Sequence, residues 1–244
     1  MKTRILGAVL VLLVTSAVVS ADEVSDCLER ALKLHKAGKL VEAKAEIEKA
    51  LAAIAPMARA LMPKPEVKGN TYINYEHAFR VTQPETDWRV RSIKGTGGGR
   101  ATYPLCQLTY VRKGRAGDDI IIFYMRDLKE FLGGQYDEVK GNELAFAKLA
   151  GKQMASAVAQ LTDVKVTTQT EITVSGLTGV RTNYTARKKG KNIPMKCFTL
   201  HVIRGHMMLT GMFVGSERNE ADVTPAFESI LKSIDLSPVT PTPK

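Results

Sequence analysis

The last predicted hairpin of the chain carries the residue types that bind soft metal ions. Two strand-like segments, residues 195–203 and 206–214, flank Arg204 and Gly205. If these two residues form the turn, His201 faces Met208, and one face of the hairpin gathers the candidate ligands Cys197, His201, His206, Met208 and Met212. Thiolate, imidazole and thioether groups suit copper(I). We expect these side chains to fill the core under a helix instead, so we predict no metal site and no cofactor and keep copper handling as an alternative.

Hydrolysis through a nucleophile would need an activated serine or cysteine, a base and an orienting acid. The sequence contains no G-x-S-x-G elbow, and Asp118-Asp119 lies in a predicted turn, where carboxylates are usually solvated. The four histidines fall in segments that specify no triad: His35, His77, His201 and His206. We therefore predict that the chain is not an enzyme. A hydrolase that uses residues 195–213 is the remaining catalytic alternative.

A glycine-rich segment, KGTGGGR at residues 94–100, could cradle a phosphate through its backbone N–H groups. A nucleotide loop of that kind follows a strand and opens a helix. Here the chain continues through Pro104 into a strand, so the segment is predicted to be a loop without a phosphate site.

Two basic turns form the candidate binding surface. Each joins two predicted strands, and together they contain seven cations: Arg112, Lys113, Arg115, Arg187, Lys188, Lys189 and Lys191. If both hairpins point the same way, these side chains cluster at one end of the sheet and attract anionic surfaces. The alternative is two solvated turns. Nucleic acid is not expected as a partner, because the strands lack interleaved aromatic residues.

The first 21 residues have the pattern of a secretory signal peptide. Lys2 and Arg4 precede an apolar stretch, and Val19-Ser20-Ala21 is a small-residue cleavage site. The alternative is a membrane anchor, but the apolar stretch is shorter than the roughly 20 residues that a spanning helix needs. We expect an exported protein, periplasmic or extracellular, with no transmembrane segment in the mature chain. The whole chain has 35 Lys and Arg residues against 25 Asp and Glu residues, so cleavage leaves an excess of eight positive charges.

Three cysteines allow at most one internal disulfide bond in an oxidising compartment. Cys106 and Cys197 both lie in strand-like segments, whereas Cys27 belongs to a separate helical segment. Cys106–Cys197 is the preferred pair, and three buried free thiols remain the alternative.

Residues 22–62 are predicted to form a helical hairpin, followed by an extended linker at residues 63–70. Apolar residues recur at helical spacing on both sides of Gly38, and Ala31, Ala43 and Ala50 would let the helices approach closely. The segment AGKLVEAKAEIEKALAAIAP resembles the turn and second helix of a tetratricopeptide repeat. The chain has one copy, whereas arrays need about three. The apolar face of the hairpin must therefore dock either on the rest of this chain or on another copy.

Residues 71–236 read as strands, a helix over residues 142–161, four strands and a helix over residues 217–233, before a tail at residues 237–244 that we predict to be disordered. This order predicts the α+β class, with an antiparallel sheet covered by helices. It resembles the PsbP-like family, an α/β/α sandwich. The resemblance is carried by Phe79-Arg80-Val81 before Pro84 and Trp88, by the strand at residues 179–184, and by the closing PAFESILKSI at residues 225–234.

The resemblance implies an accessory or interaction role, because members of that family are mostly proteins of this kind. The sequence as a whole predicts an exported, non-enzymatic binding module that contacts a protein partner or an anionic surface of the cell envelope. It does not specify the oligomeric state.

Overall fold

The fold is described from a computed structural model of the chain. The structure describes residues 22–84, 87–93, 101–112, 115–157, 161–217 and 220–238; the side chains of residues 55–61, 112, 115–118, 155–157, 220 and 222 are outside the description. The chain divides into two compact units with a boundary between Pro63 and Lys64.

The first unit is a helical hairpin. A helix over residues 22–36 is followed by a turn, in which Gly38 has a φ of +73°, and by α2 (Leu40–Leu61). Small side chains are buried where the helices approach: Cys27, Ala31, Ala43 and Ala50. Arg30 Nε donates to Glu46 Oε2 at 2.8 Å and joins the two helices. The hairpin predicted for the N-terminal segment is confirmed, and its likeness to a tetratricopeptide repeat stays a prediction.

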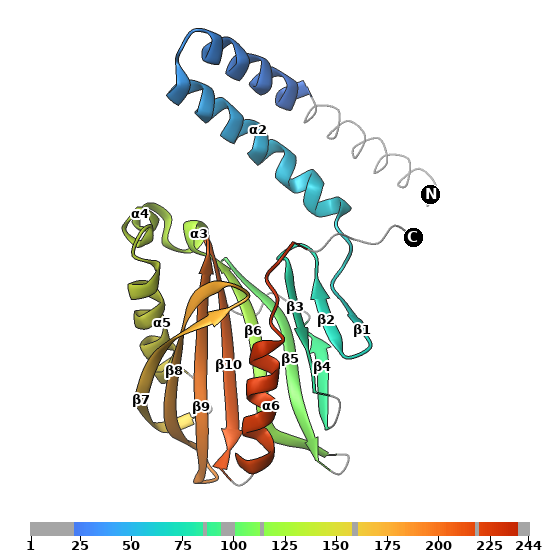
Figure 1. Cartoon of the computed structure of the whole chain (residues 1–244), viewed down its shortest axis with the longest axis vertical. Helices are drawn as coiled ribbons and strands as arrows, with labels where there is room; N and C mark the ends of the chain where they lie inside the picture. Colours follow the sequence, from blue (N-terminus) through green and yellow to red (C-terminus); the bar gives the residue numbers. More distant parts are fainter. Residues whose placement is uncertain are drawn as a thin grey trace, which may run out of the picture. The chain divides into compact units, whose positions relative to one another are not determined.

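The second unit is built on a seven-stranded antiparallel sheet, as far as the described residues go (Figure 1). Its strands are β4 (Trp88–Ser92), β5 (Thr102–Arg112), β6 (Arg115–Asp127), β7 (Leu161–Val174), β8 (Leu177–Lys188), β9 (Ile193–Arg204) and β10 (Met207–Ser216). The order across the sheet is β4-β5-β6-β10-β9-β8-β7. Strand β9 is buried over most of its length, because both faces of the sheet are covered there, whereas β7 is a long edge strand with mostly exposed side chains.

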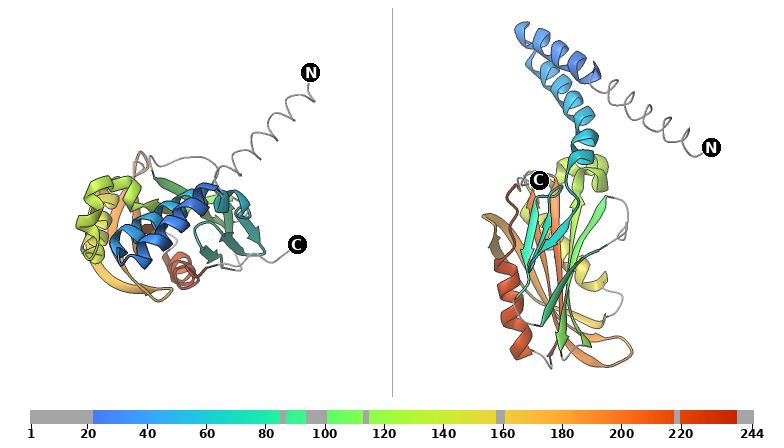
Figure 2. Two further views of the ribbon diagram at one scale, coloured as in Figure 1. Left: turned by 90° about the horizontal axis from the view of Figure 1, so that it is seen from above. Right: turned by 90° about the vertical axis from the view of Figure 1, so that its right-hand side faces the viewer.

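Helix α6 (Glu220–Lys232) covers one face of this sheet and helix α5 (Glu143–Ala157) covers the other, as the right-hand view of Figure 2 shows. A second sheet of β1 (Glu66–Lys68), β2 (Thr71–Asn74) and β3 (Phe79–Thr82) adds to the α6 face. The main core lies on that face and is rich in aromatic rings, including Phe79, Phe123, Phe198, Phe213 and Phe227. We call the two sides of the sheet the α6 face and the α5 face.

The α5 face is more polar. Smaller apolar clusters occupy its two ends, and the buried polar residues Thr182, Thr199, His201 and Thr210 lie between them. Gly151 of α5 sits directly over Thr182, where a Cβ atom would lie only 2.1 Å from the Thr182 hydroxyl oxygen. The helix therefore approaches the sheet where it has no side chain.

The α+β class, the antiparallel sheet and the covering helices follow the prediction from the sequence. Three local features differ from it. Strand β1 lies inside the predicted linker at residues 63–70, the first strands form a separate small sheet, and residues 128–139 contain two short helices, α3 (Leu128–Leu132) and α4 (Tyr136–Val139). The Asp127 side chain caps α3 by accepting a hydrogen bond from the Glu130 N–H. Aspartate is a preferred residue at the N-cap of a helix, so the sequence does contain a signal for the start of α3.

Candidate functional site

The two basic turns lie at the same end of the seven-stranded sheet. Arg112 pairs with Arg115 where β5 meets β6, and Lys188 pairs with Ile193 where β8 meets β9. The register of β10 against both neighbours carries Ser216 toward this same end. The two turns are three strand spacings apart, or roughly 15 Å at about 4.8 Å per spacing. The condition set by the sequence, that the hairpins point the same way, is therefore met by the backbone.

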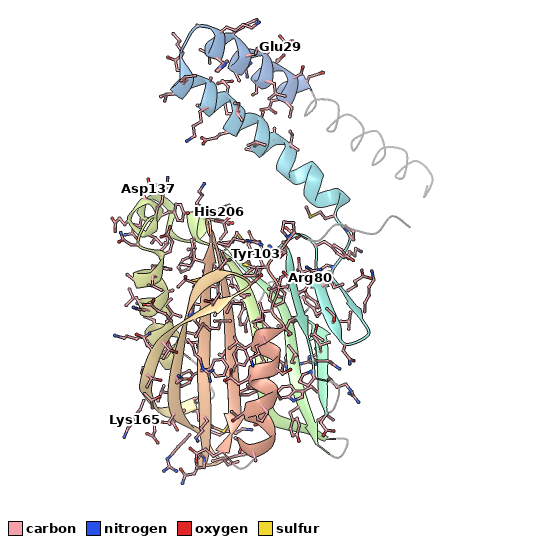
Figure 3. The ribbon with its side chains drawn as sticks, in the orientation of Figure 1. Glu29, Arg80, Tyr103, Asp137, Lys165 and His206 are labelled. Carbon is pink, nitrogen blue, oxygen red and sulfur yellow. The ribbon has the colours of Figure 1, made fainter. Side chains whose placement is uncertain are left out.

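The described side chains at this end are mostly exposed. We call Arg187, Lys188, Lys189 and Lys191, with the backbone positions of Arg112 and Arg115, the basic end. Arg187 donates to Asn192 Oδ1 at 2.8 Å, and its Nε lies 3.8 Å from Asp163 Oδ2. Lys113 lies outside the described residues. Lys165 on β7 adds a further cation at this end, and Figure 3 places it at the opposite end of the sheet from His206.

The register of the last hairpin differs from the prediction. Arg204 pairs with Met207, so the two central turn residues are Gly205 and His206 and not Arg204 and Gly205. Gly205 has a φ of +61°, and the first central position of a tight hairpin turn favours glycine for this reason. As a result His201 faces Thr210, Met212 faces Thr199 and Cys197 faces Val214. The assignment of faces survives, because a shift of two residues keeps every side chain on its side of the sheet.

This register separates the candidate copper ligands. Met208 packs with Leu128 and Val139 at one end of the α5 face, and Cys197 packs with Tyr184 at the other. His206 lies in the turn, with its Nε2 atom 3.6 Å from the carboxylate of Asp127. Among the described residues, no group of three or more His, Cys, Asp or Glu side chains is placed to hold a metal ion. Met212 lies near the Tyr184 cluster and is partly buried.

His201 lies in the middle of the α5 face and is fully buried. Neither of its ring nitrogens has a hydrogen-bond partner, and the same holds for the hydroxyl oxygens of Thr199 and Tyr184. Burial lowers the pKa of His201 to about 4, with a smaller contribution from the positive charge of Arg126. The imidazole is therefore neutral near pH 7, and it meets no nucleophile or carboxylate through a hydrogen bond.

The predicted Cys106–Cys197 disulfide is wrong for this fold, in which all three cysteines are free and buried. Cys106 belongs to the aromatic core of the α6 face, together with Phe198. Cys197 precedes Phe198 in the same strand and so points to the α5 face. The sheet lies between the two sulfur atoms. Burial raises the pKa of both thiols, that of Cys197 to about 12.

A groove that the sequence did not indicate lies on the α6 face beside α6. It has a volume of about 400 Å³ and is lined by residues of β7, β8, β9, β10 and α6. Arg181 of β8 is one of its charged lining residues, and Arg181 Nη1 lies 2.6 Å from Glu228 Oε1 on α6. We call it the α6 groove. The alternation of β8 places Arg181, Asn183 and Thr185 on one face, but only the position of α6 decides that this face borders a groove.

The helical hairpin has a second, shallow groove of about 370 Å³ between its helices. Several large apolar side chains are exposed on the hairpin, among them Leu28, Leu32, Leu40 and Ile47. His35 and Lys44 border this groove. Within the described part of the chain, no helix combines the length and the apolar character that crossing a bilayer requires.

Three predictions fall on residues that the structure does not describe. The signal peptide at residues 1–21 and the glycine-rich segment at residues 94–100 lie outside the described residues, as does most of the tail at residues 237–244. They stay predictions.

The second unit is thus an α+β sandwich. No family model matches the chain. No curated protein matches it either. Solved structures do match, with low sequence identity.

One of these structures is the PsbP protein (CyanoP) of the cyanobacterium Synechocystis sp. PCC 6803. It matches 73% of this chain and 99% of its own, with 13% identity and a TM-score of 0.47. Another is LpqN of Mycobacterium tuberculosis, which is involved in cell envelope biogenesis. It matches 72% of this chain and 90% of its own, with 10% identity and a TM-score of 0.44. The PsbP-like resemblance noted in the sequence is thus found again among solved structures, and at these values it concerns the fold alone.

Proposed function

We propose that this chain is an exported, non-enzymatic accessory protein that binds an anionic surface of the cell envelope through the basic end of its sheet. The observation that carries the proposal is the shared direction of the two basic turns. Turns on opposite ends of the sheet could not contact one flat surface together, whereas these two can.

The distribution of charge supports this surface as the contact. The hairpin of residues 22–63 has seven acidic and seven basic residues, so it contributes no net charge. The positive excess of the mature chain therefore belongs to the second unit. Asp163 offsets part of the charge of Arg187, but Lys189 and Lys191 are exposed on the turn itself.

A lysine or arginine near an acidic membrane surface contributes about 1 kcal/mol to binding. Four such side chains would contribute about 4 kcal/mol, which corresponds to roughly a thousandfold in affinity. The attraction acts within a Debye length of about 8 Å at physiological ionic strength, so binding should weaken steeply as salt is added.

The test is sedimentation of the protein, starting at Asp22, with vesicles. Vesicles of phosphatidylcholine with phosphatidylglycerol should retain it, and vesicles of phosphatidylcholine alone should not. Replacement of Lys188, Lys189 and Lys191 by glutamate should weaken retention at least about a hundredfold, because each replacement reverses a charge.

The matched control replaces three exposed lysines near the other end of the sheet, Lys129, Lys140 and Lys232, by glutamate. This variant has the same net charge as the first. Retention that falls equally in both variants would mean that net charge alone acts and that the basic end is not the contact. Equal retention on neutral and anionic vesicles would reject the proposal.

A further inference from the structure

The α6 groove has the size and the lining of a small-molecule site. Its volume of about 400 Å³ falls within the range of roughly 300–1,000 Å³ typical of ligand pockets. Such pockets are mostly apolar and contain a few well-placed polar groups. The groove has this composition.

Two largely buried aromatic rings border the groove: Phe198 is 4% exposed and Phe227 is 6% exposed. Phe198 and Phe227 both line the groove, and their ring centroids are 5.9 Å apart in an edge-on arrangement. Phe198 is stacked on Phe213 at 4.0 Å, and Phe227 contacts Trp88 at 5.8 Å. Phe213 covers one face of the Phe198 ring and the Arg181 guanidinium covers the other, so a ligand reaches this ring only at its edge. Since both rings are fixed by the core, their exposed parts need little ordering when a ligand binds.

Arg181 is held in place at the polar side of the groove. Its guanidinium carbon lies 3.9 Å from the centroid of the Phe198 ring. Its Nε donates to Asn183 Oδ1 at 2.9 Å and its Nη1 donates to Glu228 Oε1 at 2.6 Å. A guanidinium has five N–H donors in a planar fork, so these two bonds orient the group and leave other donors for a ligand.

The charges that line the groove define the ligand. Arg181 and Lys196 are positive and Glu228 is negative, so these three residues carry one net positive charge. We propose that the α6 groove binds a small amphiphile with a single negative charge, whose acidic group meets Arg181 and whose apolar body contacts the small exposed parts of Phe198 and Phe227. A carboxylate suits the planar fork of Arg181.

The experiment compares three probes with the same ten-carbon chain, namely decanoate, decanol and decylammonium, on the protein starting at Asp22. Trp88 is the only tryptophan in the chain and contacts Phe227, so its fluorescence reports on the groove. Calorimetry gives the affinity independently. Decanoate should bind with a Kd below about 1 mM, and decanol and decylammonium should bind at least about tenfold more weakly.

Two variants test the acidic subsite. Arg181→Met keeps an unbranched apolar side chain but removes the guanidinium, and it should weaken decanoate binding at least about tenfold, with no effect on decanol. Glu228→Gln removes the carboxylate that competes for Arg181 and should tighten decanoate binding. A purely structural ion pair predicts the opposite for Glu228→Gln, so this variant decides the question even if Arg181→Met fails to fold.

The matched control is an ion pair that does not line the groove, Lys148 and Glu171, at 2.8 Å between α5 and β7. Lys148→Met and Glu171→Gln make the same charge changes and should leave decanoate binding unchanged. Equal affinity for decanoate and decanol, or a loss of decanoate binding in Glu228→Gln, would overturn the proposal.

The acidic group could belong to a free molecule or to a lipid in a bilayer, and vesicle sedimentation separates these sources. If the Arg181→Met variant no longer binds decanoate but is retained normally on anionic vesicles, the ligand is a free molecule. If the variant loses both decanoate binding and retention on anionic vesicles, the ligand is a lipid headgroup. The variant with glutamate at positions 188, 189 and 191 should no longer be retained on anionic vesicles but should still bind decanoate. The proposals for the α6 groove and for the basic end are therefore tested separately.

Discussion

Replacement of the buried His201 by leucine should remove a pH-dependent loss of stability. His201 is fully buried and both ring nitrogens lack a partner. Its pKa is lowered from the ordinary value of 6.5 to about 4, chiefly by burial. The folded protein therefore favours the neutral imidazole, whereas the unfolded chain takes up a proton at a higher pH.

The sign and size of the effect follow from proton linkage. Between pH 6.5 and pH 4 the unfolded state binds more protons than the folded state, so the free energy of unfolding falls as the pH falls. Each pH unit in this window removes about 1.4 kcal/mol, so the whole window removes roughly 3 kcal/mol. Above pH 6.5 the imidazole is neutral in both states and the contribution is constant.

The assay is urea unfolding at pH 7, 6, 5 and 4 of the wild type, His201→Leu and Thr210→Val. His201→Leu should be at least as stable as the wild type at pH 7, since an apolar group replaces unpartnered buried nitrogens. Its advantage should grow by roughly 3 kcal/mol on going to pH 4. Thr210→Val alters the cross-strand neighbour of His201 without a titrating group, so its stability difference should not depend on pH. Parallel curves for wild type and His201→Leu would refute the reasoning.

Three further outcomes test the packing. Gly151→Ala should lower the free energy of unfolding in urea by about 1–3 kcal/mol, because the new Cβ would lie 2.1 Å from the Thr182 hydroxyl oxygen. Thr182→Ala in the same chain should restore part of this loss. A Gly151→Ala variant that is more stable than the wild type would contradict this contact. Asp119→Ala should lower the free energy of unfolding by about 1–3 kcal/mol, since the buried Asp119 carboxylate accepts from the Ser216 N–H at 2.6 Å. Asp119→Asn should lower it less, because the amide oxygen can still accept this hydrogen bond. Thiol titration of unreduced protein should give three thiols after unfolding and slow reaction of Cys197 before it; a count of one would indicate a disulfide bond.

The elements of the sandwich could be predicted because they depend on short-range patterns. The alternation in β9 separates Phe198 and Leu200 from Cys197 and His201, and the structure keeps that separation. The register of the last hairpin could not be predicted as securely, since it depends on which two residues occupy the turn. Gly205 is compatible with two turns, and the fold uses the one that places it first.

The face of the sheet on which Cys106 lies could not be predicted from the sequence for a related reason. Strand β5 has an irregularity between Pro104 and Gln107, and both Leu105 and Cys106 are buried in the aromatic core. A regular strand would put these neighbours on opposite faces, so alternation alone cannot place Cys106. The shared direction of the basic turns, by contrast, follows from strand order once the sheet is known.

The position of α6 links the core to the groove. Gly215 of β10 has no side chain, and a Cβ atom there would lie 3.2 Å from the Phe227 ring and 3.3 Å from Val223. Helix α6 therefore packs closely over β10, and the groove lined by Arg181 and Asn183 of β8 lies beside it. A larger residue at position 215 would displace the helix and change core and groove together. Charge variants at Arg181 and Glu228 leave Gly215 and its contacts with Phe227 and Val223 unchanged, so they test the ligand contacts without introducing a clash under the helix.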